Sequence, residues 1–194
     1  VPEKDLFNII TAAAKFNALV LIDEAYHHFY SGTMLSYINE LSNLVISRTF
    51  SKAFGLASIR IGLLISSPNI IQELYKVKLV HEISGLAAKI GEYFLDHIEI
   101  VNQYVDDVNK GKKILYTRLN RIGFEVIKSD ANFLFFKSPN NIMPLKLKQY
   151  LELNDILIKG PFEDHPFDNH LRITVGDECQ MKHFCDIVSD YILK

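Results

Sequence analysis

One lysine occupies a stretch that is a poor place for an ordinary solvated charge. Lys52 is surrounded in the sequence by Phe50, Ala53 and Phe54, whereas most lysines are simply exposed surface residues. A lysine that is desolvated or lies beside cations holds its proton less tightly, and its free amine can form a Schiff base with an aldehyde or ketone. Lys52 is therefore a candidate nucleophile for carbonyl chemistry.

Phosphate-binding groups accompany this lysine. Thr49 and Ser51 flank it with hydroxyls, and Arg60 follows shortly after in the sequence. Two hydroxyls and a guanidinium can hold a phosphate, the arginine through bidentate contacts. A reactive amine beside such groups indicates a phosphorylated aldehyde as the cofactor.

An acid and a phenol precede the lysine. Asp23 directly follows the apolar run Ala18–Ile22, and Tyr26 comes three residues later. An acid at this position can have the ordinary role of a helix cap or of a solvated strand end. In open α/β sheets, however, ligands bind outside the carboxyl ends of the strands. A carboxylate at that place can hold the protonated ring nitrogen of pyridoxal phosphate, and the phenol can bond a ring oxygen.

Alternating helices and strands in the first half of the chain predict an α/β fold that would position these groups. Short continuous apolar runs are typical of parallel strands buried on both faces. The predicted strands are Ala18–Ile22, Leu44–Ile46 and Ile61–Ile65, and the predicted helices are Glu3–Asn17 and Ser67–Leu79.

A long helical pattern without proline follows, from Glu82 to about Arg121. Such a length is unusual for one globular helix, so we expect a break inside it. Its weak points are Gly85, Gly91 and Gly111.

The last third of the chain predicts a small α+β layer. The predicted strands are Phe124–Ile127, Phe133–Phe136, Ile156–Lys159 and Leu171–Val175, and the helices are Pro144–Leu153 and Glu178–Leu193. We expect two domains, 1–105 and 106–194.

Four segments together resemble fold-type I pyridoxal-phosphate aminotransferases, and most closely the histidinol-phosphate aminotransferase branch. The matching segments are Asp23–Tyr26 (DEAY), Arg48–Gly62 (RTFSKAFGLASIRIG), Ala131–Phe133 (ANF) and Leu171–Gly176 (LRITVG). The resemblance covers essentially the whole chain. It implies a three-layer large domain with a mostly parallel sheet, represented here by its carboxyl-terminal part, followed by a small α+β domain.

The resemblance also implies residue roles. Lys52 would bond covalently to pyridoxal 5'-phosphate and move the substrate's α-proton. Asp23 would pair with the pyridinium nitrogen and Tyr26 with the phenolic oxygen. The phosphate would be bound by Thr49, Ser51 and Arg60. Arg172 would bind the carboxylate or the phosphate of the substrate.

The resemblance leaves the exact substrate open. After Lys78 the branch usually has a Pro-Tyr-Asn-like segment near the substrate, and this chain has Leu79–Ser84 (LVHEIS) instead. Transamination between an amino acid or amino phosphate and a 2-oxo acid is the first hypothesis. A pyridoxal-phosphate decarboxylase of a phosphorylated amino acid is the second, and a truncated, non-catalytic remnant is the third.

In members of the family, several parts of the pattern come before the helix that opens this chain, so this sequence does not contain them. These are the phosphate loop, the aromatic residue that stacks on the ring, and an Asn-Pro-x-x-Pro-Thr-Gly stretch. We therefore expect the 194 residues to be a carboxyl-terminal portion with little or no activity alone.

Composition and charge limit the kinds of partner that the chain is expected to bind. Lys and Arg number 21 against 23 Asp and Glu, a net charge of −2, which argues against nucleic acid and anionic membranes. No apolar run approaches the roughly 20 residues of a membrane span. Cys179 and Cys185 have neither disulfide-framework nor metal-site spacing, and His27-His28 lacks a third ligand, so we expect no metal and a cytoplasmic setting. The family resemblance implies a homodimer.

Overall fold

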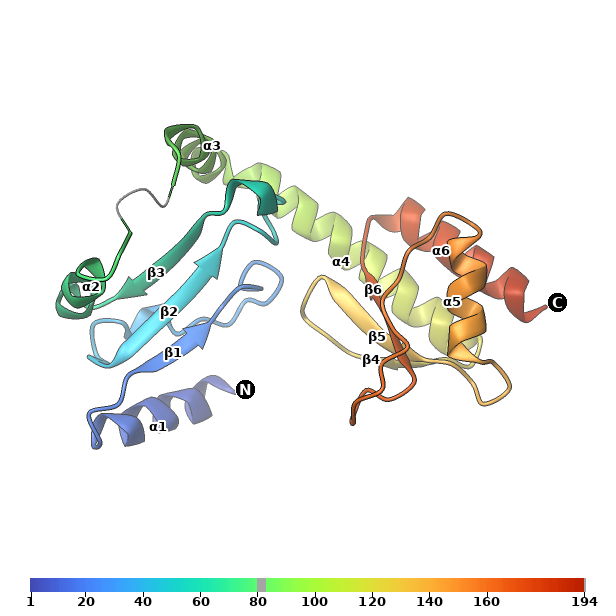
Figure 1. The fold of residues 1–194 in the computed structure, drawn as a ribbon, viewed down its shortest axis with the longest axis horizontal. Coiled ribbons are helices and arrows are strands. Elements are labelled where there is room, and N and C mark those ends of the chain that lie inside the picture. The colour runs from blue at the N-terminus through green and yellow to red at the C-terminus, as the bar shows by residue number, and fades with distance from the viewer. Residues whose placement is uncertain (80–82, 194) are drawn as a thin grey trace. The chain divides into compact units, whose positions relative to one another are not determined.

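The computed structural model describes residues 1–79 and 83–193. The chain forms two compact units, Val1–Asn102 and Gln103–Lys194 (Figure 1). The change from one unit to the other falls within helix α4 (Ile98–Arg121). Assignment of the two parts as large and small domains, 1–105 and 106–194, stays a prediction.

The first unit contains a three-stranded sheet in the order β1-β2-β3. Strands β1 (Val20–Asp23) and β2 (Leu44–Thr49) run parallel, with Asp23 opposite Ser47. Because parallel strands end at the same edge of a sheet, the residues that follow β1 and β2 are neighbours in space. The Glu24 N–H donates to the Ser47 carbonyl oxygen at 2.9 Å and continues this pairing past β1.

The prediction that the third strand is parallel is wrong. Strand β3 (Gly62–Ser66) pairs antiparallel with β2, and Thr49 lies opposite Gly62. The connection from β2 to β3 contains only the short 3-10 helix η2 (Ala57–Ile59). A parallel crossover usually needs a full helix between the strands, so this short connection turns the chain back on itself.

Helix α1 (Glu3–Ala14) covers one face of this sheet near β1. Its fully buried Ile10 packs with Leu44 and Ile46 of β2. Asn43 ties the helix to the sheet, because its side-chain amide donates to the carbonyl oxygens of Ile10 and Ala18 at 3.0 and 2.9 Å. The 3-10 helix η1 (Leu35–Tyr37) completes this side of the unit.

Burial of β1 and β3 on both faces, expected from their continuous apolar runs, is wrong. Leu21 of β1 is 60% exposed and Leu64 of β3 is 51% exposed. Their neighbours Ile22 and Ile65 face the α1 side and pack against the core there. On this second face Leu21 and Leu64 are accessible to solvent, whereas Val45 of the central strand β2 is buried.

The expected break in the long helical region is confirmed, but no glycine makes it. Helix α2 (Pro68–Tyr75) is followed by α3 (Gly85–Asp96) and α4, with His97 between α3 and α4 at φ −121° and ψ 51°. Gly85 begins α3, whereas Gly91 and Gly111 lie inside helices. Of the segment Leu79–Ser84, residues 80–82 lie outside the described residues.

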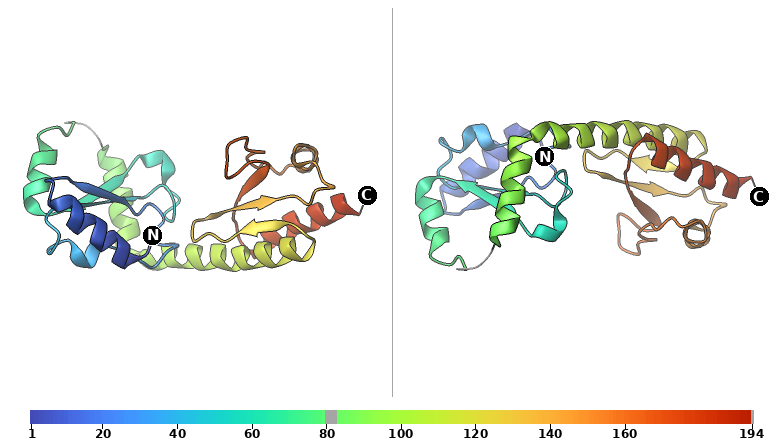
Figure 2. Two further views of the ribbon diagram at one scale, coloured as in Figure 1. Left: turned by 90° about the horizontal axis from the view of Figure 1, so that it is seen from below. Right: turned by 90° about the horizontal axis from the view of Figure 1, so that it is seen from above.

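The second unit is a three-stranded antiparallel sheet with helices packed against it (Figure 2). The strands are β4 (Glu125–Ile127), β5 (Phe133–Lys137) and β6 (His170–Thr174), and α4 is joined by α5 (Pro144–Glu152) and α6 (Glu178–Ile192). Alternate residues of β5 and β6 point into the core. Its fully buried side chains include Leu115, Leu119, Leu134, Phe136, Leu171 and Phe184.

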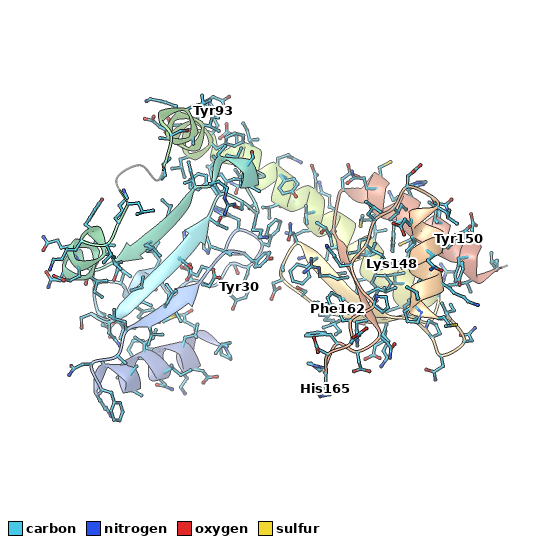
Figure 3. All side chains as sticks on the ribbon, viewed as in Figure 1. Tyr30, Tyr93, Lys148, Tyr150, Phe162 and His165 are labelled. Atoms are coloured by element: carbon cyan, nitrogen blue, oxygen red, sulfur yellow. The ribbon has the colours of Figure 1, made fainter. Side chains whose placement is uncertain are left out.

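The predicted strand Ile156–Lys159 is wrong, because only Lys159 bridges to Arg172 there. The loop before β6 carries Phe162 and His165 (Figure 3) and folds an aromatic ring onto β5: Phe167 stacks on Phe135 at 4.4 Å between centroids. His170 is buried at the start of β6.

Candidate functional site

The carboxyl end of β1 presents Asp23 to solvent. One oxygen of its carboxylate, Oδ1, accepts hydrogen bonds from the Ala25 N–H at 3.0 Å and from the Ser47 hydroxyl at 3.2 Å. The first bond shapes the turn after the strand, and the second holds the carboxylate against β2. The other carboxylate oxygen, Oδ2, takes part in neither bond and can accept from a ligand that carries an N–H.

Tyr26 and Lys52 come together from the segments that follow β1 and β2. The Lys52 Nζ lies 5.6 Å from the centroid of the Tyr26 ring, a distance at which a cation is attracted to the ring face. Lys52 is partly buried, and its neighbours Ala53 and Phe54 are buried. The structure thus places the predicted phenol beside the predicted amine.

Of the three predicted phosphate ligands, two lie together. The Thr49 hydroxyl oxygen accepts from the Ser51 N–H at 3.1 Å, so both hydroxyls occupy the turn that leads to Lys52. Arg60 is exposed and left-handed, with φ 57°, and its Nη1 donates to the carbonyl oxygen of Ala57 at 3.1 Å. That bond keeps the guanidinium on its own 3-10 turn.

A cavity of about 280 Å³ adjoins the end of β1. Asp23 and Tyr26 line it together with His27, Tyr30 and other residues of the loop after β1. Neither Lys52 nor Arg60 is among the lining residues in the described part of the chain. Of the predicted site residues, only Asp23 and Tyr26 line the cavity, so it is not by itself the predicted site.

A charged cluster that the sequence interpretation missed lies at the same strand ends. The Glu24 carboxylate accepts from Nε and Nη2 of Arg48 at 3.1 and 2.9 Å, and its side chain is only 7% exposed. The signal available in the sequence is that an acidic and a basic residue directly follow Asp23 and Ser47, and the structure then places Asp23 opposite Ser47.

The two adjacent histidines differ in their surroundings. Partial burial, together with the nearby His27 and Arg48 charges, lowers the pKa of His28 and favours its neutral ring. The ring of His28 meets Phe54 edge-on at 5.0 Å. Across residues 1–79 and 83–193, no group of three or more His, Cys, Asp or Glu is arranged to hold a metal ion.

Arg172 belongs to the second unit. It lies on the face of β6 opposite the buried Leu171 and Ile173, and its Cζ is 5.2 Å from the centroid of the Phe133 ring. A guanidinium stacked on a ring keeps its N–H edge available for a carboxylate or phosphate.

None of the helices in the described ranges has both the length and the apolar character that a membrane crossing requires.

Comparison with known proteins identifies the class of protein. The chain belongs to the aminotransferase class I and II family, whose model matches residues 1–188. This confirms the resemblance that the lysine-containing segment and its accompanying motifs suggested. Pyridoxal phosphate is the cofactor of this family.

Among individual relatives, histidinol-phosphate aminotransferase of Clostridium novyi (strain NT) is 32% identical over 186 residues, which cover 93% of this chain and 49% of that protein. The corresponding enzyme of Vesicomyosocius okutanii subsp. Calyptogena okutanii (strain HA) is 32% identical, with 99% of this chain and 54% of that protein covered. The chain thus spans about half the length of the curated relatives it matches.

A solved structure shares the fold. Histidinol-phosphate aminotransferase from Clostridium acetobutylicum superposes with a TM-score of 0.83 at 24% identity, covering 98% of this chain and 59% of the other. At this identity the likeness shows the fold alone, an α/β arrangement with small sheets.

Proposed function

We propose that this chain carries the lysine side of an aminotransferase site that uses pyridoxal phosphate to move an amino group from an amino acid or amino phosphate to a 2-oxo acid. The observation that carries the proposal is the approach of Lys52 to Tyr26 at the strand ends that also carry Asp23. Membership of the aminotransferase class I and II family supports it, and the named relatives favour a reaction like that of histidinol-phosphate aminotransferase.

The chemistry of these side chains fits the cofactor. Pyridoxal phosphate needs an anion for its ring nitrogen, a donor for its phenolic oxygen, an amine for its aldehyde and groups that bind phosphate. Asp23 supplies the anion, Tyr26 the donor and Lys52 the amine. Thr49 and Ser51 offer hydroxyls on one turn. When bound, the cofactor supplies an electron sink for the bonds at the substrate's α-carbon.

The remaining chemistry is that of the protein's own groups. Asp23 would keep the ring nitrogen protonated, which strengthens electron withdrawal. The Lys52 amine would take the proton from the substrate's α-carbon as a general base and give it back as a general acid. Arg60 would reach the phosphate by leaving its bond to Ala57, and Arg172 would bind the substrate's carboxylate or phosphate through its N–H edge.

The experiment adds pyridoxal phosphate to the purified chain and records the visible absorbance that the compound acquires when a lysine amine bonds to it. We expect this band in the wild type and its loss in Lys52→Ala. Lys76→Ala is the matched control, because Lys76 is an exposed lysine paired with Glu73 on α2. A band that survives in Lys52→Ala, or that is lost equally in both variants, contradicts the assignment of Lys52.

A decarboxylase of a phosphorylated amino acid would use the same lysine. L-threonine-O-3-phosphate decarboxylase from Porphyromonas gingivalis has a TM-score of 0.82 with this chain, but the identity is 18% and shows the fold only; it covers 100% of this chain and 60% of the other. Product analysis separates the two reactions: a new amino acid formed from the 2-oxo acid supports transfer, and carbon dioxide supports decarboxylation. A chain that never reacts with pyridoxal phosphate would favour the non-catalytic remnant.

The proposal includes assembly as a homodimer, which the family resemblance supports, and a reducing, cytoplasmic setting, which the spacing of Cys179 and Cys185 supports. Sedimentation equilibrium of the chain tests the dimer. A mass that stays at that of one chain across the accessible concentration range would contradict it.

A further inference from the structure

A buried carboxylate–guanidinium pair lies at the strand ends that carry the proposed site. The side chains of Glu24 and Arg48 are 7% and 19% exposed, and Arg48 donates twice to Oε2 of Glu24, at 3.1 and 2.9 Å. For comparison, the pair formed by Lys76, which directly follows α2, and Glu73 of α2 has side chains 67% and 70% exposed. The pair between Glu24 and Arg48 is therefore shielded from solvent, and two hydrogen bonds hold its geometry.

A loop residue completes the cluster. The Thr33 hydroxyl lies 3.0 and 2.9 Å from the two carboxylate oxygens of Glu24, to which it donates, and it accepts from Nη2 of Arg48 at 2.8 Å. The Met34 N–H donates to Oε1 of Glu24 at 2.7 Å. Both carboxylate oxygens thus have partners, and three separate segments meet in one hydrogen-bonded network. Hydrogen-bonded networks of this kind, in a low-dielectric environment, hold their side chains in one arrangement.

The network sits between the proposed site residues in the sequence. Glu24 directly follows Asp23 and lies two residues before Tyr26, whereas Arg48 directly precedes Thr49 and leads to Lys52. Adjacent residues of a strand point to opposite faces. Arg48 can therefore bond to Glu24 on one face of the sheet while Thr49 points to the other.

We propose that Glu24, with Arg48 and Thr33, is a positioning residue that sets Tyr26 against Lys52. The network joins the turn after β1 to the end of β2, and these are the two segments that bring the phenol and the amine to 5.6 Å. Its consequence for catalysis rests on the proposed function, because it matters only if Lys52 and Tyr26 serve the cofactor. The positional claim itself concerns the chain without any cofactor.

The test measures the position of Lys52 in the cofactor-free chain. The chain is labelled with [13Cε]lysine, and the Hε–Cε signal of Lys52 is assigned by its absence from Lys52→Arg. The ring current of Tyr26 shifts this signal, and Tyr26→Leu gives its position without the ring. We expect Glu24→Gln to move the Lys52 signal most of the way to the Tyr26→Leu position.

Two further variants separate positioning from stability. Glu24→Gln combined with Arg48→Met leaves no unpaired buried charge, so we expect it to regain thermal stability relative to the single variants, yet to keep the displaced Lys52 signal. Thr33→Val preserves the ion pair and removes only the bridging hydroxyl. It therefore provides a folded variant if Glu24→Gln does not fold, and we expect a smaller shift in the same direction.

Glu73→Gln is the matched control, because it removes a carboxylate that pairs with a lysine on the exposed surface. Its Lys52 signal should coincide with that of the wild type. A Lys52 signal unchanged from the wild type in each folded network variant would overturn the proposal and leave the network a purely stabilising role. The measurement needs no pyridoxal phosphate, so failure of the absorbance experiment and failure of this one remain distinguishable.

Discussion

The two cysteines show how surroundings rather than residue type decide reactivity. Cys185 lies on the inner face of α6 with only 1% of its surface exposed, whereas Cys179 is exposed on the same helix. Burial raises the pKa of the Cys185 thiol from 9.0 to about 11, and the neighbouring Arg118 opposes this only in part. A thiolate is the reactive form, so Cys185 stays inert near neutral pH.

This raised pKa predicts a loss of stability in alkali. Between pH 9 and 11 the unfolded thiol ionises while the folded one keeps its proton, so the unfolded state binds fewer protons and stability falls as pH rises. The stabilisation from the buried, protonated thiol is present in full below pH 9 and is lost as the pH rises through about 11. Urea unfolding at several pH values should show a shallower decline in Cys185→Ala, and Cys179→Ala should retain the wild-type slope.

At the scale of elements, periodicity predicted most helices and strands within a few residues, but pairing direction and burial needed the structure. The apolar run that became β3 carries no record of whether it pairs parallel or antiparallel. That depends on the short connection after β2, which has no room for a crossover helix. Similarly, the glycines of the long helical region suggested weak points, yet His97 makes the break.

Gly111 shows that a glycine in a helix can be required by tertiary packing rather than by helix flexibility. A Cβ at this position of α4 would overlap the carbonyl oxygen of Gly176 and lie 3.0 Å from that of Asp177, just before α6. Alanine normally favours a helix interior by about 1 kcal/mol over glycine. Here the backbone on the other side cannot yield as a flexible side chain can.

We expect Gly111→Ala to lower the free energy of unfolding by about 1–3 kcal/mol, in the range of overpacked cores. Gly85→Ala is the control, because a Cβ there meets nothing within 4 Å. That change should be neutral or stabilising by less than about 1 kcal/mol. Urea unfolding of both variants measures the contrast, and equal stability of the two would refute the packing explanation.

At the scale of the whole chain, each unit has its own set of buried side chains. Ile46 is fully buried in the first unit and Leu119 in the second. Truncation of a fully buried leucine or isoleucine to alanine generally lowers the free energy of unfolding by about 2–5 kcal/mol. Separate cores of this kind predict that damage to one unit is felt mainly within it.

Leu119→Ala should therefore reduce hydrogen-exchange protection in peptides from 103–193 and leave peptides from 1–79 near wild-type protection. Ile46→Ala should give the reverse pattern. Mass spectrometry of the exchanged, digested chain measures both. Equal loss of protection in the two units for either variant would instead indicate a single cooperative unit.

The sequence by itself determined the types and order of the chemistry-bearing residues, and with them the aminotransferase family. Asp23, Tyr26 and Lys52 belong to short segments that can be recognised from their local composition and spacing alone. Only the tertiary structure decided that Glu24 and Arg48 form a buried pair, that Arg60 bonds to its own turn, and that Leu21 and Leu64 face solvent. Those facts depend on contacts between segments far apart in the chain, and such contacts are set by strand register and by the path of the connections.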